Sequence, residues 1–167
     1  MAELITEVDK DDNVLGLRPR DDFYSINSII HRGAHLILFN SKNQILLQKR
    51  ALDKKWSPGL YAYSVSGTVA DESYEDCIKR EMMEELGISI PVRYIFKHFV
   101  LDKNGKAFHA IFVGKTDLET IPDYSEMSEI LWVPEDMLKK DIETHPEQYS
   151  FSFAEGMKKY WAWQKGK

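Results

Sequence analysis

The stretch from Gly67 to Ile88, GTVADESYEDCIKREMMEELGI, constrains this chain more than any other part of it. Its carboxylates Glu81, Glu84 and Glu85 are spaced i, i+3 and i+4, which places them on one face of an α-helix with their tips close together. Three like charges at that range repel one another and destabilise an isolated helix. A bound cation would remove this cost, and oxygen-only ligands favour a hard ion such as Mg²⁺ or Mn²⁺.

Signals at both ends define the helix that carries these carboxylates. Ser73 followed by Asp76 fits the helix start signature, and Gly87 is the residue type that commonly ends a helix. We therefore predict a helix over about residues 73–86. Its core side carries a stripe of apolar residues: Ile78, Met82 and Leu86. A solvated acidic surface is the structural alternative for the glutamates, since glutamate-rich helix faces are common.

The same stretch resembles the Nudix box, the family pattern G-x5-E-x7-R-E-U-x-E-E-x-G-U, where U is a bulky aliphatic residue. The part from Glu72 to Ile88 matches this pattern in full. One departure precedes it, because only the four residues TVAD separate Gly67 from Glu72, where the pattern has five. The resemblance implies an α+β fold, the α/β/α sandwich of that family with a mixed β-sheet between helices. It also implies an enzyme that hydrolyses a diphosphate linkage.

The resemblance also implies roles for individual residues of the box. It gives four carboxylate ligands for Mg²⁺ or Mn²⁺: Glu72, Glu81, Glu84 and Glu85. One of these glutamates would serve as the base toward the attacking water. Arg80 is expected to orient the carboxylates, pairing with Glu84 at i+4, rather than to contact substrate. Gly67 is expected to permit a tight backbone turn before the helix.

Candidates outside the box rest on weaker signals. Glu126 and Glu129 stand just ahead of a predicted strand, where relatives often carry acids, and Glu126 is the candidate for a second base. A solvated loop is the alternative for both. Three cations beside the loop that leads to the box could meet phosphate oxygens, with an ordinary charged surface as the alternative: Arg50, Lys54 and Lys55.

Buried histidines and aromatic residues are also expected. Four histidines lie in predicted strands and are expected to be packed rather than catalytic: His31, His35, His98 and His109. Three aromatic side chains could stack on a base, although aromatics in strands usually belong to the core: Trp56, Tyr61 and Tyr63. Cys77 lies beside the apolar stripe of the helix and is expected to be a buried small hydrophobe.

Composition favours one cytoplasmic domain over residues 1–167. Of the 167 residues, 43% are hydrophobic and 29% are charged, which is ordinary for a globular chain. No apolar run approaches the ~18 residues of a membrane span, and the acidic N-terminus resembles neither a signal nor a transit peptide. The single cysteine fits a reducing compartment, and the net charge of −5 without a basic block argues against a nucleic-acid polymer as partner. We expect a small-molecule diphosphate as partner and no membrane contact.

Alternation and turn signals predict three β-hairpins. Their strands cover residues 3–8 with 14–18, 31–39 with 45–50, and 91–101 with 107–116. The first hairpin forms an N-terminal extension over about residues 1–20, and the third turns at Asn104–Gly105. Two more strands are expected, over 61–69 and 129–133, separated from their neighbours by loops at 51–60 and 117–128. The remaining helices are expected as a short turn within 21–26, a helix at 134–140 begun by Pro134, and a closing helix at 152–165 docked on the sheet.

A second family built on the same fold supplies the main alternative. Residues 3–138 resemble isopentenyl-diphosphate isomerase in outline, so the chain resembles an isomerase-like subgroup that keeps the hydrolase box. The isomerases carry a cysteine nucleophile and a metal-binding histidine before the box, where this chain has Ser66 and Thr68. Only His31 matches another of their metal-ligand positions. Serine and threonine do not supply the acid and base that isomerisation needs, which disfavours this reading.

The function expected from these observations is a metal-dependent Nudix hydrolase that cleaves a nucleoside diphosphate or a derivative of one. A non-catalytic binding domain is a further alternative, disfavoured because a degenerate domain has no reason to keep a costly charge cluster. Specificity in such folds lies in loops, here 51–60, 117–128 and the N-terminal hairpin, none of which carries a readable motif. The oligomeric state, monomer or homodimer, stays open.

Overall fold

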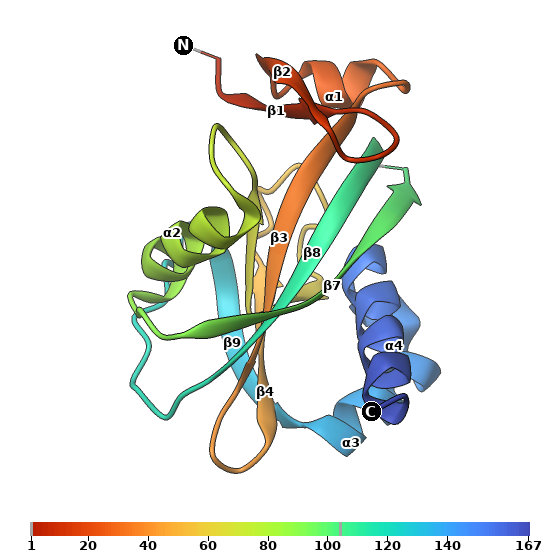
Figure 1. Ribbon diagram of the computed structural model, residues 1–167. Helices are drawn as coiled ribbons and strands as arrows, with labels where there is room; N and C mark the ends of the chain where they lie inside the picture. Colours follow the sequence, from red (N-terminus) through yellow and green to blue (C-terminus); the bar gives the residue numbers. More distant parts are fainter. Residues whose placement is uncertain (1, 104) are drawn as a thin grey trace.

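The computed structural model describes residues 2–103 and 105–167. Its strands are β1 (Leu4–Val8), β2 (Val14–Pro19), β3 (Ile30–Phe39), β4 (Gln44–Arg50), β5 (Tyr61–Ala62), β6 (Val65–Thr68), β7 (Val92–Asp102), β8 (Gly105–Lys115) and β9 (Met127–Pro134). Its helices are α1 (Asp22–Ser25), α2 (Tyr74–Leu86), α3 (Glu135–Thr144), the 3₁₀ turn Pro146–Gln148 and α4 (Phe151–Lys165). Figure 1 shows their arrangement.

The strands form one mixed sheet organised around β3. β3 runs parallel to β8 over its whole length, and pairs in antiparallel fashion with β1 and β6. β7 joins the free side of β8, which confirms the third hairpin, and β9 pairs with β4. The long apolar runs in β3 and β4 therefore fit strands buried on both faces.

The expected hairpin between β3 and β4 is wrong beyond its turn, since these strands share only the pair Phe39–Ile45. The reason lies in Ser64, whose hydroxyl accepts a hydrogen bond from the amide of Leu38 (2.9 Å) and donates one to the carbonyl of Leu46 (2.6 Å). Its buried side chain thus stands between the two strands. The same insertion divides the expected strand at 61–69, so that β5 pairs with β4 and β6 pairs with β3.

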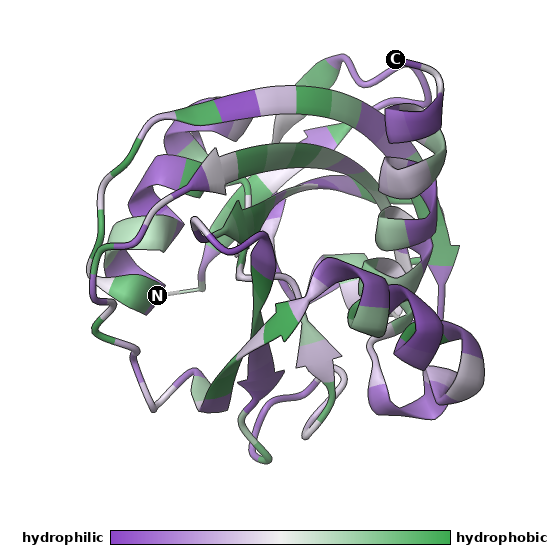
Figure 2. Cartoon of the chain, turned by 90° about the horizontal axis from the view of Figure 1, so that it is seen from below, coloured by the Kyte–Doolittle hydropathy of each residue, from purple (hydrophilic) through white to green (hydrophobic). Residues whose placement is uncertain are grey.

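Helices cover both faces of the sheet, which confirms the α/β/α sandwich (Figure 1). One core layer lies under α2 and joins its stripe of Ile78, Met82 and Leu86 to residues of β3, β4 and β8; Cys77 is buried there as expected. The other layer joins α3 and α4 to the opposite face. Figure 2 shows hydrophobic stretches running along the curved strands, whereas the helices alternate between hydrophobic and hydrophilic segments.

The N-terminal hairpin is confirmed as β1 and β2, and a charged contact fastens its turn to the body of the protein. The buried carboxylate of Asp12 pairs with Arg32 (2.7 Å) and with Lys97, and it accepts hydrogen bonds from the hydroxyl of Tyr74 at the start of α2. These contacts place the hairpin, followed by α1, at the start of β3 (Figure 1). Gly67 and Thr68, where the Nudix-like stretch begins, pair with β3 close to the same end.

The remaining expectations are mostly confirmed. The short helical turn is α1, α3 follows Pro134, and α4 closes the chain against the sheet. At the third hairpin, Gly105 has a φ of 125°, which favours glycine, while Asn104 lies outside the described residues. In the part of the chain that the structure describes, no helix is both long and apolar enough to span a bilayer.

Candidate active site

Local sequence signals place helix α2, which carries the candidate ligands, as predicted. The hydroxyl of Ser73 accepts a hydrogen bond from the amide of Asp76 and caps the start of α2. Gly87 ends the helix with a φ of 64°, a left-handed conformation in which other residues are strained. With both ends fixed, the helix presents Glu81 and Glu84 next to Arg80 and turns Glu85 toward the sheet.

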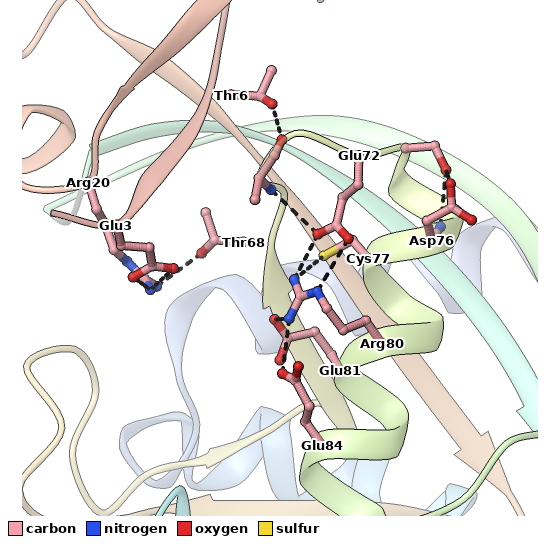
Figure 3. Close-up of polar contacts among 12 residues, drawn as sticks. Glu3, Thr6, Arg20, Thr68, Glu72, Asp76, Cys77, Arg80, Glu81 and Glu84 are labelled. Carbon is pink, nitrogen blue, oxygen red and sulfur yellow. Dashed lines mark hydrogen bonds and ion pairs between the residues drawn. The ribbon is translucent and has the colours of Figure 1, made fainter. Parts of the chain in front are cut away.

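Arg80 holds three of the predicted ligand carboxylates in one place (Figure 3). It binds both oxygens of Glu72 (2.7 and 3.2 Å) and also contacts Glu81 (2.8 Å) and Glu84 (3.0 Å). The hydrogen bonds from Arg80 lower the pKa of Glu72. The loop shortened by one residue therefore still brings Glu72 to the helix, and the expected i+4 pair of Arg80 with Glu84 is present.

Glu85 occupies a different environment from the other glutamates. It is only 7% exposed, and its Oε2 atom accepts hydrogen bonds from the Gln48 side chain (3.0 Å) and the Ser66 amide (3.2 Å). Burial, and next the nearby charge of Glu81, raise the pKa of Glu85 to about 8. Burial also raises the pKa of Glu81, in spite of its contact with Arg80.

The role expected for Gly67 is corrected by the structure. Gly67 lies within β6, and its φ is outside the left-handed region that would require glycine. A Cβ atom at this position would instead lie 2.3 Å from Cγ of Glu81. Glycine is therefore needed for the close approach of the Glu81 side chain to the strand, and not for a turn.

These glutamates form one wall of a pocket of about 750 Å³. Glu81, Glu84 and Glu85 line it from α2, whereas Glu72 reaches the site through Arg80. All three cations proposed for phosphate contact line the same pocket: Arg50, Lys54 and Lys55. The structure thus brings acidic and cationic side chains from distant parts of the chain to the lining of one cavity, a combination that suits a site for a metal and a diphosphate.

Among these cations, Arg50 differs from its neighbours. Its Nε donates to the carbonyl oxygen of Trp56 (2.7 Å), and burial lowers its pKa because the charge loses contact with water. Lys54 is instead paired with Glu126 (2.7 Å), which also lines the pocket. Lys55 lies over the ring of Tyr24, 4.7 Å from its centroid. Arg50 is therefore the best placed of the three to meet an anion.

The other candidates divide between the pocket and the core. Glu129 accepts a hydrogen bond from the hydroxyl of Tyr61 (2.7 Å), and neither belongs to the described lining of the pocket. Trp56 and Tyr63 do line it. The histidines are packed as expected, and yet three of them also line the pocket: His31, His35 and His109.

Sequence reasoning missed the groups that bind Glu85. Gln48 is buried within the otherwise apolar run ILLQKR, and a polar residue in such a run is a signal that could have indicated a buried partner. The amide of Ser66 carries no such signal, because a backbone group has no residue type. Ser66 also lies with its Oγ 3.0 Å from Nδ1 of His35.

The donor chemistry of the site fits a hard divalent cation. In residues 2–103 and 105–167, no group of three or more acidic, histidine or cysteine side chains is placed so that it could hold a metal ion as it stands. Arg80 pairs with Glu81 and Glu84 instead, and Glu85 is a buried carboxyl group beside Glu81. Carboxylate oxygens are nevertheless ligands that suit Mg²⁺ or Mn²⁺.

Comparison with known proteins agrees with this geometry. The NUDIX domain model matches residues 29–153. The chain is 49% identical to a prenyl-diphosphate phosphatase from Methanosarcina mazei, with 92% of each chain covered. It is 31% identical to an isopentenyl-diphosphate Delta-isomerase from Photorhabdus laumondii, covering 92% of this chain and 89% of the relative. A crystal structure from Deinococcus radiodurans superposes with a TM-score of 0.81 at 23% identity, covering 94% and 98% of the two chains.

Proposed function

This chain belongs to the Nudix family as a pyrophosphohydrolase, and we propose that its substrate is a prenyl diphosphate, hydrolysed with the help of Mg²⁺ or Mn²⁺. Water would cleave the bond between the two phosphates, giving a prenyl monophosphate and inorganic phosphate. The observation that carries the proposal is the pocket that Glu81 and Glu85 line together with the half-buried Arg50. The similarity to the prenyl-diphosphate phosphatase supports the choice of organic group.

The residues of the pocket divide the work according to charge. Glu81, Glu84 and Glu85, with Glu72, would hold the divalent ion, which when bound polarises phosphoryl oxygens and separates the substrate's charge from the carboxylates. Arg80 positions these carboxylates through its ion pairs.

Arg50, which lines the same pocket and donates its described hydrogen bond to the carbonyl of Trp56, would bind a phosphate oxygen. Glu126 lines the same pocket and is a second candidate base, but its pair with Lys54 must open first.

A nucleoside diphosphate is the second candidate substrate. Tyr24 and Trp56 lie together at the pocket, with ring centroids 4.6 Å apart, and these half-buried rings would suit contact with a nucleobase. Lys55 lies over both rings and would meet a negatively charged group beside them. The assay below therefore includes nucleotides.

Isomerisation of isopentenyl diphosphate is the alternative activity, and the pocket disfavours it. The hydroxyl of Ser66 lies by His35, and that of Thr68 accepts a hydrogen bond from Arg20 (3.1 Å). Neither hydroxyl can act as the acid and base that must add and remove protons at carbon.

The proposal is tested by a phosphate-release assay with Mg²⁺ or Mn²⁺ over isopentenyl, dimethylallyl, geranyl and farnesyl diphosphates and a set of nucleoside diphosphates and their derivatives. We expect release from prenyl diphosphates that EDTA abolishes and excess Mg²⁺ restores, with the monophosphate as second product. Release from nucleotides alone would contradict the prenyl substrate. Conversion of isopentenyl to dimethylallyl diphosphate without phosphate release would support the isomerase, and no turnover by folded protein would support a binding domain.

A further inference from the structure

The loop between Gly67 and Glu72 lies against the N-terminal hairpin. The amide of Thr6 in β1 donates a hydrogen bond to the carbonyl of Val69 (3.0 Å), and the Thr6 hydroxyl donates one to the carbonyl of Ala70. Thr6 is only 3% exposed, so its hydroxyl needs a partner inside the protein. The hairpin therefore supplies donors to two successive carbonyls of the loop that is one residue shorter than the family pattern.

The same loop separates β1 from β3 at this point. The two strands pair at Glu7 and His31, so the next pair in this register would be Thr6 with Arg32. Val69 stands between them instead, because its amide donates to the carbonyl of Arg32 (3.0 Å) while its carbonyl accepts from the amide of Thr6. Val69 is fully buried, and its backbone is held from both sides.

Two further contacts join the hairpin to this stretch. Nη2 of Arg20, the residue after β2, donates to the hydroxyl of Thr68 (3.1 Å). The hydroxyl of Tyr74 donates to the carboxylate of Asp12 in the hairpin turn (3.1 Å to each oxygen). The hairpin thus contacts the stretch before the loop, within it and at the start of α2. It lies outside residues 29–153, which the family model matches.

The loop leads directly to the carboxylate that holds Arg80. The amide of Ala70 donates to Oε1 of Glu72 (3.5 Å), and Glu72 binds Arg80 through both of its oxygens. Arg80 in turn pairs with two further glutamates of α2. Figure 3 shows Thr6 on one side of this loop, and Glu72 with Arg80 on the other. A displacement of Ala70 would therefore reach the guanidinium around which the carboxylates are arranged.

We propose that Thr6 is a positioning residue for the hydrolysis, acting through Ala70 to set where Glu72 meets Arg80. This inference rests on the proposed function. Because the loop has one residue fewer than the family pattern, its path to Glu72 depends on where its remaining residues are anchored, and the hairpin provides that anchor. An extension outside the matched domain thereby becomes part of the framework of the active site.

The test begins with Thr6→Val, which keeps the branched shape of the side chain and removes the hydroxyl. With dimethylallyl diphosphate as substrate, kcat should fall about tenfold, the lower end of the range for residues that orient a ligand from behind it. KM should change little, because Thr6 does not belong to the described lining of the pocket. Thr6→Ser retains the hydroxyl and should restore kcat.

A second measurement needs neither substrate nor metal. Amide hydrogen exchange in EDTA reports on the loop directly, and residues 69–72 should exchange faster in Thr6→Val than in the wild type or in Thr6→Ser. The loop would then open more often because the carbonyl of Ala70 has lost its described donor.

Thr116→Val is the matched control. Thr116 is also buried, at 9% exposed, and its hydroxyl accepts a hydrogen bond from the amide of Leu118 (3.0 Å). Its own amide binds the carbonyl of Phe39, at the opposite end of β3 from the loop, and it does not belong to the described pocket lining. Thr116→Val should therefore leave kcat and the exchange of residues 69–72 unchanged.

Thermal unfolding establishes whether each variant is folded, and Thr6→Ala replaces Thr6→Val if the latter is not. An unchanged kcat, or unchanged exchange over residues 69–72, in a folded variant without the hydroxyl would overturn the inference. An equal fall of kcat in Thr6→Ser or Thr116→Val would do the same. Failure of the proposed function is distinct, because the wild type itself would then release no phosphate from prenyl diphosphates, while the exchange measurement would still report on the loop.

Discussion

Gly67 of β6 and Glu81 of α2 approach one another so closely that a Cβ atom on Gly67 would lie 2.3 Å from Cγ and 2.8 Å from Cδ of Glu81. The Glu81 side chain therefore fits against β6 only because residue 67 has no side chain. Because Glu81 also contacts Arg80, its placement influences the whole group of carboxylates.

Gly67→Ala should move the Glu81 carboxylate and lower kcat/KM by about a hundredfold, the scale expected when a reacting group is misplaced by ~1 Å. The fold should persist, because the displaced side chain is flexible. Gly166→Ala is the control, since the nearest atom to its Cβ would be 3.6 Å away and activity should not change. Full activity of the Gly67→Ala enzyme would show that the close approach has no catalytic importance.

Glu85→Gln should reduce metal-dependent turnover by about a hundredfold, because it removes a charged ligand while keeping the size and hydrogen-bond acceptor that Gln48 and Ser66 contact. Steady-state rates at saturating Mg²⁺ measure this effect. Glu75→Gln changes an exposed glutamate of the same helix that is paired with Lys79, and it should leave the rate unaltered. An active Glu85→Gln enzyme would exclude Glu85 as a ligand.

The same substitution should stabilise the metal-free protein at high pH. Folding raises the pKa of Glu85 from about 4.5 to about 8. The stability that the neutral carboxyl group contributes is therefore fully present below pH 4.5 and is lost as the pH rises through 8. The wild type should therefore lose stability across this interval in EDTA, and Glu85→Gln should lose less. Denaturant unfolding from pH 5 to 9 tests this, and identical pH profiles would contradict it.

Arg50→Gln should lower kcat/KM by about 10- to 100-fold, the scale of one hydrogen bond to a charged group, mostly through a higher KM. The stability of the variant should not fall much, because Arg50 is a half-buried cation whose described hydrogen bond is to the carbonyl of Trp56. Lys54→Gln is the comparison, and its effect should be smaller because Lys54 is already paired with Glu126. Equal effects of the two substitutions would argue against a special role for Arg50.

Acid should destabilise the fold through its buried histidines. Burial lowers the pKa of His98 to about 4, so its neutral form contributes stability that is fully present above pH 6.5 and is lost as the pH falls toward 4. His98→Leu should therefore show a smaller loss of unfolding free energy between pH 7 and 4.5, by on the order of 1 kcal/mol because solvent screens this half-buried ring. Denaturant unfolding at both pH values measures the difference, and parallel losses in variant and wild type would disprove it.

Helix α2 could be predicted from sequence because its determinants are local. The cap at Ser73, the end at Gly87 and the spacing of Glu81, Glu84 and Glu85 all act within a few residues, and the structure agrees with each of them. The pairing of Arg80 with Glu84 follows from the same helical periodicity. The family pattern added Glu72, whose contact with Arg80 persists across the shortened loop.

Long-range packing decided what the sequence by itself did not. Ser64 separates two strands that look like a hairpin, and Gly67 is required by Glu81 on another element. Gln48 and Ser66 reach Glu85 from distant positions along the chain, and His35 meets His109 only because β3 and β8 run parallel. The sequence therefore determined the helix that carries the glutamates and the fold class. The partners of these carboxylates and the contact between His35 and His109 depend on which strands become neighbours, a property that no local pattern encodes.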